Sequence, residues 1–207
     1  MAKKPHGPEP HGPDPIVTAA LALAAEKGWR GLALADIAER AKVPLTEVIE
    51  HFGSKSAILA AYSHRIDLRM LDGGTESGES PRDRLFDLIM RRFDAMADDR
   101  RALRAILRQA ADDPWALLCG GGRFLKSMAL TLEAAGISSS GLRGLAMIQG
   151  VSTVYLYAFK TFLDDDSADH ARTMAALDKA LRRAEDVSSL IWRRRAPPQT
   201  ATPPDLR

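Results

Sequence analysis

Residues that could do chemistry are few and widely spaced in this 207-residue sequence. His6 and His11 lie in a proline-rich N-terminal arm, and three aspartates stand together at 164–166. A metal site needs three or four ordered ligands, so two histidines on an extended arm do not predict one. The aspartates precede a predicted helix, where acidic residues are favourable, so helix capping is the preferred interpretation. We expect no metal site and no cofactor.

The motifs of the common catalytic classes are also missing from the sequence. Gly120–Gly122 is not followed by the Lys-Ser/Thr pair of a phosphate-binding loop, and neither Gly-x-Ser-x-Gly nor His-Glu-x-x-His occurs. Because Cys119 is the one cysteine, a disulfide framework and a cysteine-based zinc site are excluded. We therefore expect that this protein is not an enzyme.

Charge and hydropathy are those of a soluble globular protein. The net charge is +2, from 29 Lys+Arg and 27 Asp+Glu, and 45% of the residues are hydrophobic. Such a balance does not indicate a nucleic-acid binder, so any DNA contact must come from local clustering of charge. The longest stretch without a charge, 144–159, is shorter than the roughly 20 apolar residues of a membrane-spanning helix. We expect a cytoplasmic protein without integral membrane association.

Apolar residues recur at three- and four-residue spacing along most of the chain, which predicts an all-α protein of about nine helices. The first three helices are short and cover 16–27, 34–41 and 45–52. Gly28 ends the first of them, and Pro44 suits the first turn of the third. Ser54 can cap the fourth helix.

The later helices are longer. One opens at Ser80–Pro81, one covers 141–163, and the last runs from about 167 to 194. Three successive glycines at 120–122 cost roughly 1 kcal/mol each against alanine, so they are expected to break or kink their helix.

Three short helices, with a tight turn between the second and third, describe a helix-turn-helix. The stretch 28–59 resembles the DNA-binding domain of the TetR family of bacterial transcription regulators. The residues that carry this resemblance are Gly28–Trp29, Asp36–Glu39, Ala41, Val43, His51–Phe52, Ser54–Lys55 and Leu59. It implies a helix-turn-helix DNA-binding domain over 16–60 and a helical ligand-binding and dimerisation domain over 61–195. A disordered Pro-rich arm at 1–15 and a disordered tail at 196–207 flank them.

The recognition helix departs from the family pattern. Lys42 stands where the family usually has glycine, Leu32 where it has threonine, and Ile49 where it has tyrosine. Residues 16–72 carry seven Lys+Arg and seven Asp+Glu, so no net charge attracts DNA to this domain. The resemblance implies groove-facing side chains at Thr46, Glu47, Glu50 and His51, and phosphate contacts at Lys42 and Lys55.

The resemblance also implies a homodimer and a small-molecule site in the helical body. The apolar stripe of the last helix is core or interface, and the family favours interface. The expected interface residues are Leu145, Ile148, Ser152, Phe159, Met174, Leu177, Leu181, Ala184 and Ile191. The expected pocket residues are Phe93, Met96, Leu107, Trp115, Phe124, Met128 and Tyr155. Aromatic and methionine side chains make adaptable pockets, so we expect a small apolar ligand.

Two functions remain open at this point. The first is a dimeric TetR-like transcription regulator, whose partners are a double-stranded DNA operator, a second copy and a small apolar ligand. The alternative is a lipid- or isoprenoid-binding accessory protein of the ubiquinone-biosynthesis type, whose TetR-like fold no longer binds DNA. The acidic recognition helix and the apolar body are similar in kind to that accessory family.

Overall fold

The computed structural model describes residues 13–74, 79–110, 114–167 and 169–193, with side chains for 14–74, 79–109, 121–167 and 169–186. Nine α-helices, one 3-10 helix and no strand occur in this part of the chain, which confirms the all-α prediction. The predicted tail and most of the predicted arm lie outside the described residues. The last three residues of that arm, 13–15, belong to the first helix instead, because proline is tolerated in a first helical turn.

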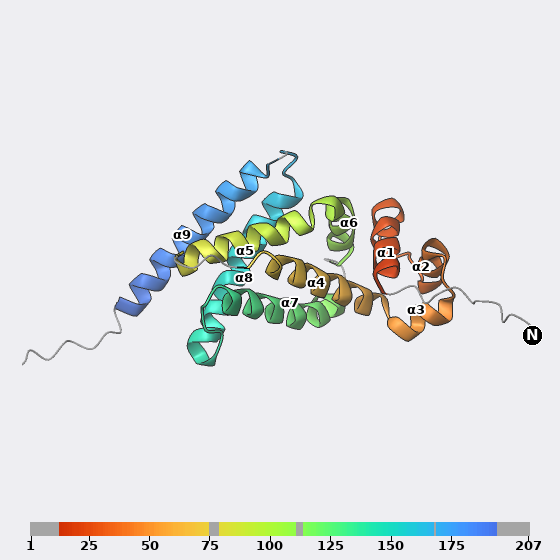
Figure 1. The fold of residues 1–207 in the computed structure, drawn as a ribbon, viewed down its shortest axis with the longest axis horizontal. Coiled ribbons are helices and arrows are strands. Elements are labelled where there is room, and N and C mark those ends of the chain that lie inside the picture. Colours follow the sequence, from red (N-terminus) through yellow and green to blue (C-terminus); the bar gives the residue numbers. More distant parts are fainter. Residues whose placement is uncertain (1–12, 75–78, 111–113, 168, 194–207) are drawn as a thin grey trace, which may run out of the picture.

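Three short helices form a unit at one end of the molecule (Figure 1). They are α1 (Pro13–Lys27), α2 (Leu34–Ala41) and α3 (Leu45–His51). α4 (Lys55–Leu71) leads from this unit into the body, where it packs on α5 and α7, and α1 packs on α6. The remaining elements are α5 (Pro81–Ala95), η1 (Ala97–Asp99), α6 (Arg100–Ala110), α7 (Pro114–Ala134), α8 (Gly141–Leu163) and α9 (Ala171–Arg193).

The helix ends carry the signals that the sequence predicts. Gly28 follows α1 with a φ of 83°, a left-handed conformation that favours glycine. The hydroxyl of Ser54 accepts a hydrogen bond from the Ala57 amide at 3.2 Å. The hydroxyl of Ser80 accepts one from the Asp83 amide at 3.1 Å. Both serines therefore act as N-caps.

The predicted break at the three glycines is wrong. α7 continues as one helix through 120–122. The cost of each glycine is only about 1 kcal/mol, and packing elsewhere along the helix offsets it. The later part of α7 is held by side chains buried against the rest of the body, among them Met128 and Leu132.

The start of α9 also differs from its prediction. The helix begins at Ala171 rather than at about 167, and Asp165 caps it from a distance. One carboxylate oxygen of Asp165 accepts hydrogen bonds from the amide and hydroxyl of Thr173 at 2.8 and 2.7 Å. The other accepts a bond from the Ser167 amide at 3.1 Å. The capping interpretation of this aspartate is therefore confirmed.

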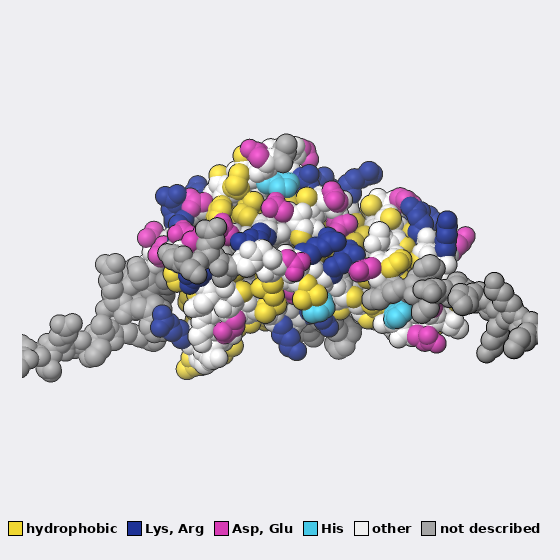
Figure 2. Space-filling model, viewed as in Figure 1, with side chains coloured by type: hydrophobic (Ala, Val, Ile, Leu, Met, Phe, Trp, Pro, Cys, Tyr) yellow, Lys and Arg dark blue, Asp and Glu magenta, His cyan; other side chains and the backbone are white. Residues whose placement is uncertain are grey.

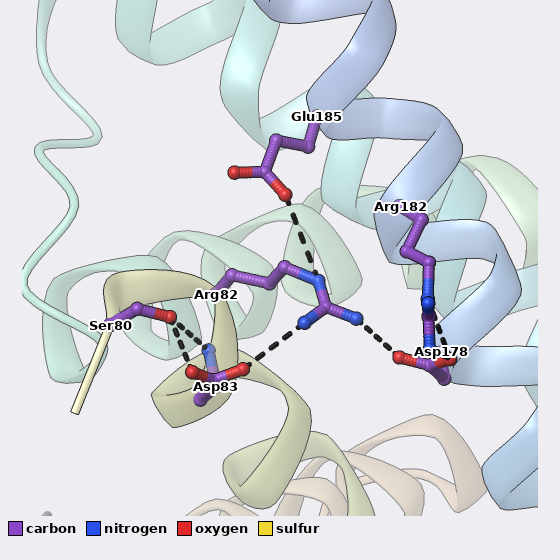
Figure 3. A network of polar contacts seen from close by, with 6 residues as sticks. All are labelled: Ser80, Arg82, Asp83, Asp178, Arg182 and Glu185. Carbon is purple, nitrogen blue, oxygen red and sulfur yellow. Dashed lines mark hydrogen bonds and ion pairs between the residues drawn. The ribbon is translucent and has the colours of Figure 1, made fainter.

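A polar network joins the first turn of α5 to α9 (Figure 3). The guanidinium of Arg82 contacts Asp83 at 3.1 Å on its own helix, and it donates to Asp178 of α9. Arg182 donates to the same Asp178 carboxylate from one turn further along, at 2.8 Å. These side chains are partly exposed, so the network contributes modestly to stability and mainly fixes where α9 lies against α5.

Cationic and anionic side chains are interspersed over the face of the molecule seen in Figure 2. No described helix combines the length and the hydropathy that crossing a bilayer would require.

Candidate nucleic-acid interface

The turn between α2 and α3 fixes how α3 stands on the domain. Lys42 follows α2 with a φ of 59°, and its amide donates to the Glu39 carbonyl at 3.1 Å. Val43 follows and is buried, as are Val48 in the middle of α3 and Phe52 at its end. α3 is therefore held by one side, and its opposite side is open.

The open side of α3 carries exposed side chains of two kinds. Thr46, Glu50 and His51 are exposed, as predicted for residues that face a groove. Leu45 and Ile49 are exposed as well, with 41% and 53% of their surface accessible. Sequence reasoning noted Ile49 only as a departure and did not include either aliphatic residue in the interface. Leu45 and Ile49 are one helical turn apart, and this spacing could have shown that they lie on the same side of the helix.

Glu47 differs from its prediction. Its side chain is half-buried, and its Oε1 atom is buried without a hydrogen-bond partner among the described residues. Glu47 is therefore not one of the outward-facing residues.

Lys55, a predicted phosphate contact, is hydrogen-bonded within the chain. Its Nζ atom donates to the carbonyls of Trp29 and Arg30 at 2.9 and 3.1 Å. It also lies 5.5 Å from the centre of the Trp29 ring. Burial lowers the pKa of this ammonium group. Lys55 thus binds the chain's own turn after α1, and a contact to phosphate would have to replace these two hydrogen bonds.

The same turn contacts the body of the protein. The Arg30 amide donates to the side-chain oxygen of Gln109 at the end of α6, and the Arg30 guanidinium reaches the Gln109 carbonyl at 3.4 Å. These contacts join the turn after α1 to the end of α6, and Lys55 ties the same turn to the start of α4.

Aromatic side chains gather in the body between α5, α7 and α8. Phe93 stacks on Tyr155 with ring centres 5.3 Å apart, and Phe124 lies 5.6 Å from Tyr155. These three predicted pocket residues are therefore brought together. Met96 and Met128 are buried in the same core. Leu107 is 40% exposed and lies outside this buried core, and Trp115 and Cys119 lie outside the described side chains.

Sequence reasoning missed the polar centre of this region. Arg92 donates to the Asp67 carboxylate, and its Nε contacts the Tyr155 hydroxyl at 3.3 Å. Ser127 donates to the same Asp67 oxygen at 2.6 Å. All four side chains are buried, and burial raises the pKa of the Tyr155 hydroxyl. The sequence contained one indication of this cluster. Arg92 follows Leu88 by four residues, which places a charged side chain on the apolar side of α5.

The residues of the predicted dimer interface differ in how deeply the single chain buries them. Ser152, Leu177 and Leu181 are buried within the single chain, because α9 packs along α8, so these residues belong to the core. Phe159 is half-buried and stacks on Tyr155 in the aromatic cluster, with ring centres 5.6 Å apart. Ile148, Met174 and Ala184 are half-buried, and the side chain of Ile191 lies outside the description.

The exposed apolar surface lies on α8 instead. Leu145, a predicted interface residue, is 59% exposed, and Leu142 and Leu156 are 88% and 53% exposed. Leu142 and Leu145 lie about one turn apart, and Leu156 lies about three turns further along the same side of α8, which faces away from the core.

The fold and the open face of α3 define an all-helical protein with an N-terminal helix-turn-helix. Residues 16–62 match the model for bacterial regulatory proteins of the tetR family. The chain is similar to a TetR transcriptional regulator from Nitrosomonas europaea ATCC 19718, with 27% identity, a TM-score of 0.69, and coverage of 84% of this chain and 97% of that chain. It also shares its fold with a TetR regulator from Rhodococcus sp. RHA1, at 20% identity and a TM-score of 0.57, with 81% and 94% covered.

No curated protein matches the sequence. The N-terminal domain of this chain belongs to the TetR family, and the body has the helical fold of TetR-family transcriptional regulators.

Proposed function

We propose that this protein is a dimeric transcription regulator that binds operator DNA through α3 and responds to a small apolar ligand. The observation that carries the proposal is the open face of α3 in a TetR-family domain. An α-helix with its side chains is about 10–12 Å wide, and the major groove of B-DNA is about 12 Å wide. Thr46 and Glu50 stand opposite the buried Val48, where base edges would lie.

The basic side chains around α3 predict few contacts to DNA phosphates. Lys42 is exposed beside α3, whereas Lys55 is bound to two carbonyls and Arg40 is paired with Glu26. Each phosphate contact adds about −0.9 to the slope of log K against log salt concentration. We therefore expect a shallow salt dependence and a specificity that rests on base contacts.

The exposed stripe of α8 supports the dimer. Leu142, Leu145 and Leu156 present large apolar side chains to solvent along one helix, and a second copy of α8 would cover them.

The aromatic cluster supports the ligand site. Phe93, Phe124 and Tyr155 come from three helices, and the cluster continues through Arg92 and Asp67 to α4, the helix that leads to the DNA-binding unit. An apolar ligand that parted these rings would therefore act directly on the position of α4.

The test is fluorescence anisotropy with the DNA upstream of the protein's own gene, at about 50 and about 200 mM salt. We expect binding that exceeds binding to a scrambled duplex. Glu50→Gln should lower the ratio of specific to scrambled affinity, because Glu50 is exposed on α3. Glu39→Gln is the matched control, since Glu39 is an exposed glutamate of α2. No binding at the lower salt, to this DNA or to a pool of genomic fragments, would overturn the proposal.

A further inference from the structure

The side chains of α3 are an unusual set for a helix that enters the major groove. The helix reads Leu-Thr-Glu-Val-Ile-Glu-His and carries neither lysine nor arginine. The commonest specific contact to DNA, arginine or lysine to the O6 and N7 atoms of guanine, is therefore not available to α3. What the helix offers instead is the exposed aliphatic pair of Leu45 and Ile49 beside Thr46 and Glu50.

These four residues form two adjacent rows. At about 100° per residue, Leu45 and Ile49 lie about 40° apart around the helix, and Thr46 and Glu50 form the next row. Val48 is fully buried and lies opposite Thr46 and Glu50, whereas Leu45 and Ile49 lie on the flank of the helix, about 60° and 100° from Val48, and are still 41% and 53% exposed. The aliphatic row is continuous with the polar face that the proposed function assigns to base edges.

Each row fits a different group of the major groove. An aliphatic side chain contacts the 5-methyl group of thymine, which is the apolar group of that groove. A glutamate accepts a hydrogen bond from the N4 amino group of cytosine. Leu45 and Ile49 are separated by about 6 Å along the helix axis, which is close to two base-pair steps of about 3.4 Å.

We infer that Leu45 and Ile49 select the operator by contact with thymine methyl groups about two base pairs apart, with Glu50 reading a neighbouring cytosine. This inference rests on the proposed function and names the bases that the same face recognises. It also explains why two large aliphatic side chains remain exposed on a helix of seven residues.

The test replaces thymine by deoxyuridine, which lacks only the methyl group. The probe is the upstream duplex that wild-type protein binds, made once with thymine and once with deoxyuridine throughout. Burial of one methyl group corresponds to roughly a 4-fold change in affinity, so loss of two contacts should weaken wild-type binding about 10-fold or more.

Variants separate methyl contact from any change in DNA shape. Ile49→Ala should bind the thymine duplex several-fold more weakly than wild type, and its preference for thymine over deoxyuridine should fall by roughly 4-fold, because the contact of Leu45 remains. Ile49→Val should keep part of the preference. Leu68→Ala is the matched control, because Leu68 is 52% exposed on α4 and should leave the preference unchanged. Circular dichroism checks that each variant is folded.

Two results would overturn the inference, and they differ. If wild-type protein binds its operator specifically but equally well with thymine and deoxyuridine, or if Ile49→Ala keeps the full preference, the methyl contacts are absent while the proposed function stands. If no duplex is bound specifically, both the inference and the proposed function fail.

Discussion

At the scale of single residues, Lys42 combines a backbone cost with a position beside the DNA-binding face. Its φ of 59° lies in the left-handed region, which costs a residue with a side chain roughly 1–2 kcal/mol and glycine much less. The proposed function predicts that a contact between the Lys42 ammonium group and a DNA phosphate offsets this cost.

Substitution of Lys42 by glycine and by alanine separates these two effects. Lys42→Gly should raise the free energy of unfolding by up to about 1 kcal/mol, because the strain is relieved, whereas Lys42→Ala should not raise it. Both variants should bind operator DNA more weakly and with a salt slope reduced by about 1 for each half-site. Urea unfolding and anisotropy measure the two quantities. Unchanged DNA affinity in both variants would show that Lys42 does not contact phosphate.

Asp165 predicts how stability depends on pH. Burial alone would raise the pKa of its carboxyl group, but hydrogen bonds from Ser167 and Thr173 outweigh burial and hold the pKa well below its usual range. A carboxyl with a lowered pKa stabilises the folded state above the unfolded-state pKa of about 3.9, and this contribution is lost as the pH falls below that value.

Asp165→Asn should therefore lower the free energy of unfolding by about 1–3 kcal/mol at neutral pH. The difference from wild type should shrink as the pH falls below about 4, because the wild-type carboxylate then becomes protonated in the unfolded state. Urea unfolding across pH measures this effect. A difference that stays constant down to about pH 2 would contradict the assignment.

At the scale of elements, α8 has two distinct sides. Val151, Tyr155, Ala158 and Phe162 face the core, whereas Leu142, Leu145 and Leu156 face solvent. Large apolar side chains in a row on the outer side are typical of a surface that a partner covers.

Charged substitutions on α8 test that surface. Leu145→Glu combined with Leu156→Glu should convert a dimer into a folded monomer, because each buried glutamate would lose its hydration at the interface. Sedimentation velocity gives the mass. Leu130→Glu on α7 is the control, since Leu130 is 39% exposed and should leave the mass unchanged. A wild-type protein that sediments as a monomer would contradict the dimer.

At the scale of the whole molecule, one buried polar cluster connects four helices. Asp67 comes from α4, Arg92 from α5, Ser127 from α7 and Tyr155 from α8. A buried charge left without its partner costs more than the pair contributes, so this cluster fixes the relative position of the four helices.

Removal of one partner should therefore be worse than removal of both. Asp67→Leu should lower the free energy of unfolding by about 3–5 kcal/mol, because Arg92 is left buried and unpaired. Adding Arg92→Met should recover a large part of that loss. Urea unfolding of Asp67→Leu, Arg92→Met and the double variant measures the difference. A double variant as unstable as the sum of its single variants would contradict a paired cluster.

Local features of the sequence determined the helices and the helix-turn-helix. Apolar spacing, the serine caps and Gly28 act over a few residues, so they could be read without the tertiary structure. The resemblance over 28–59 likewise follows from residues close together in the chain. The glycines at 120–122 show where local reasoning fails, because packing along the rest of α7 offsets a local penalty.

Only the tertiary structure decided which side chains are available for contact. Lys55 binds a turn that lies 25 residues away in the chain. Arg92 of α5 pairs with Asp67 of α4. Leu177 and Leu181 lie on a stripe that fits core and interface equally well by spacing. The packing of α9 on α8 buries them and leaves the outer side of α8 exposed. Such contacts depend on how whole helices meet, and periodicity along one helix carries no information about its partner.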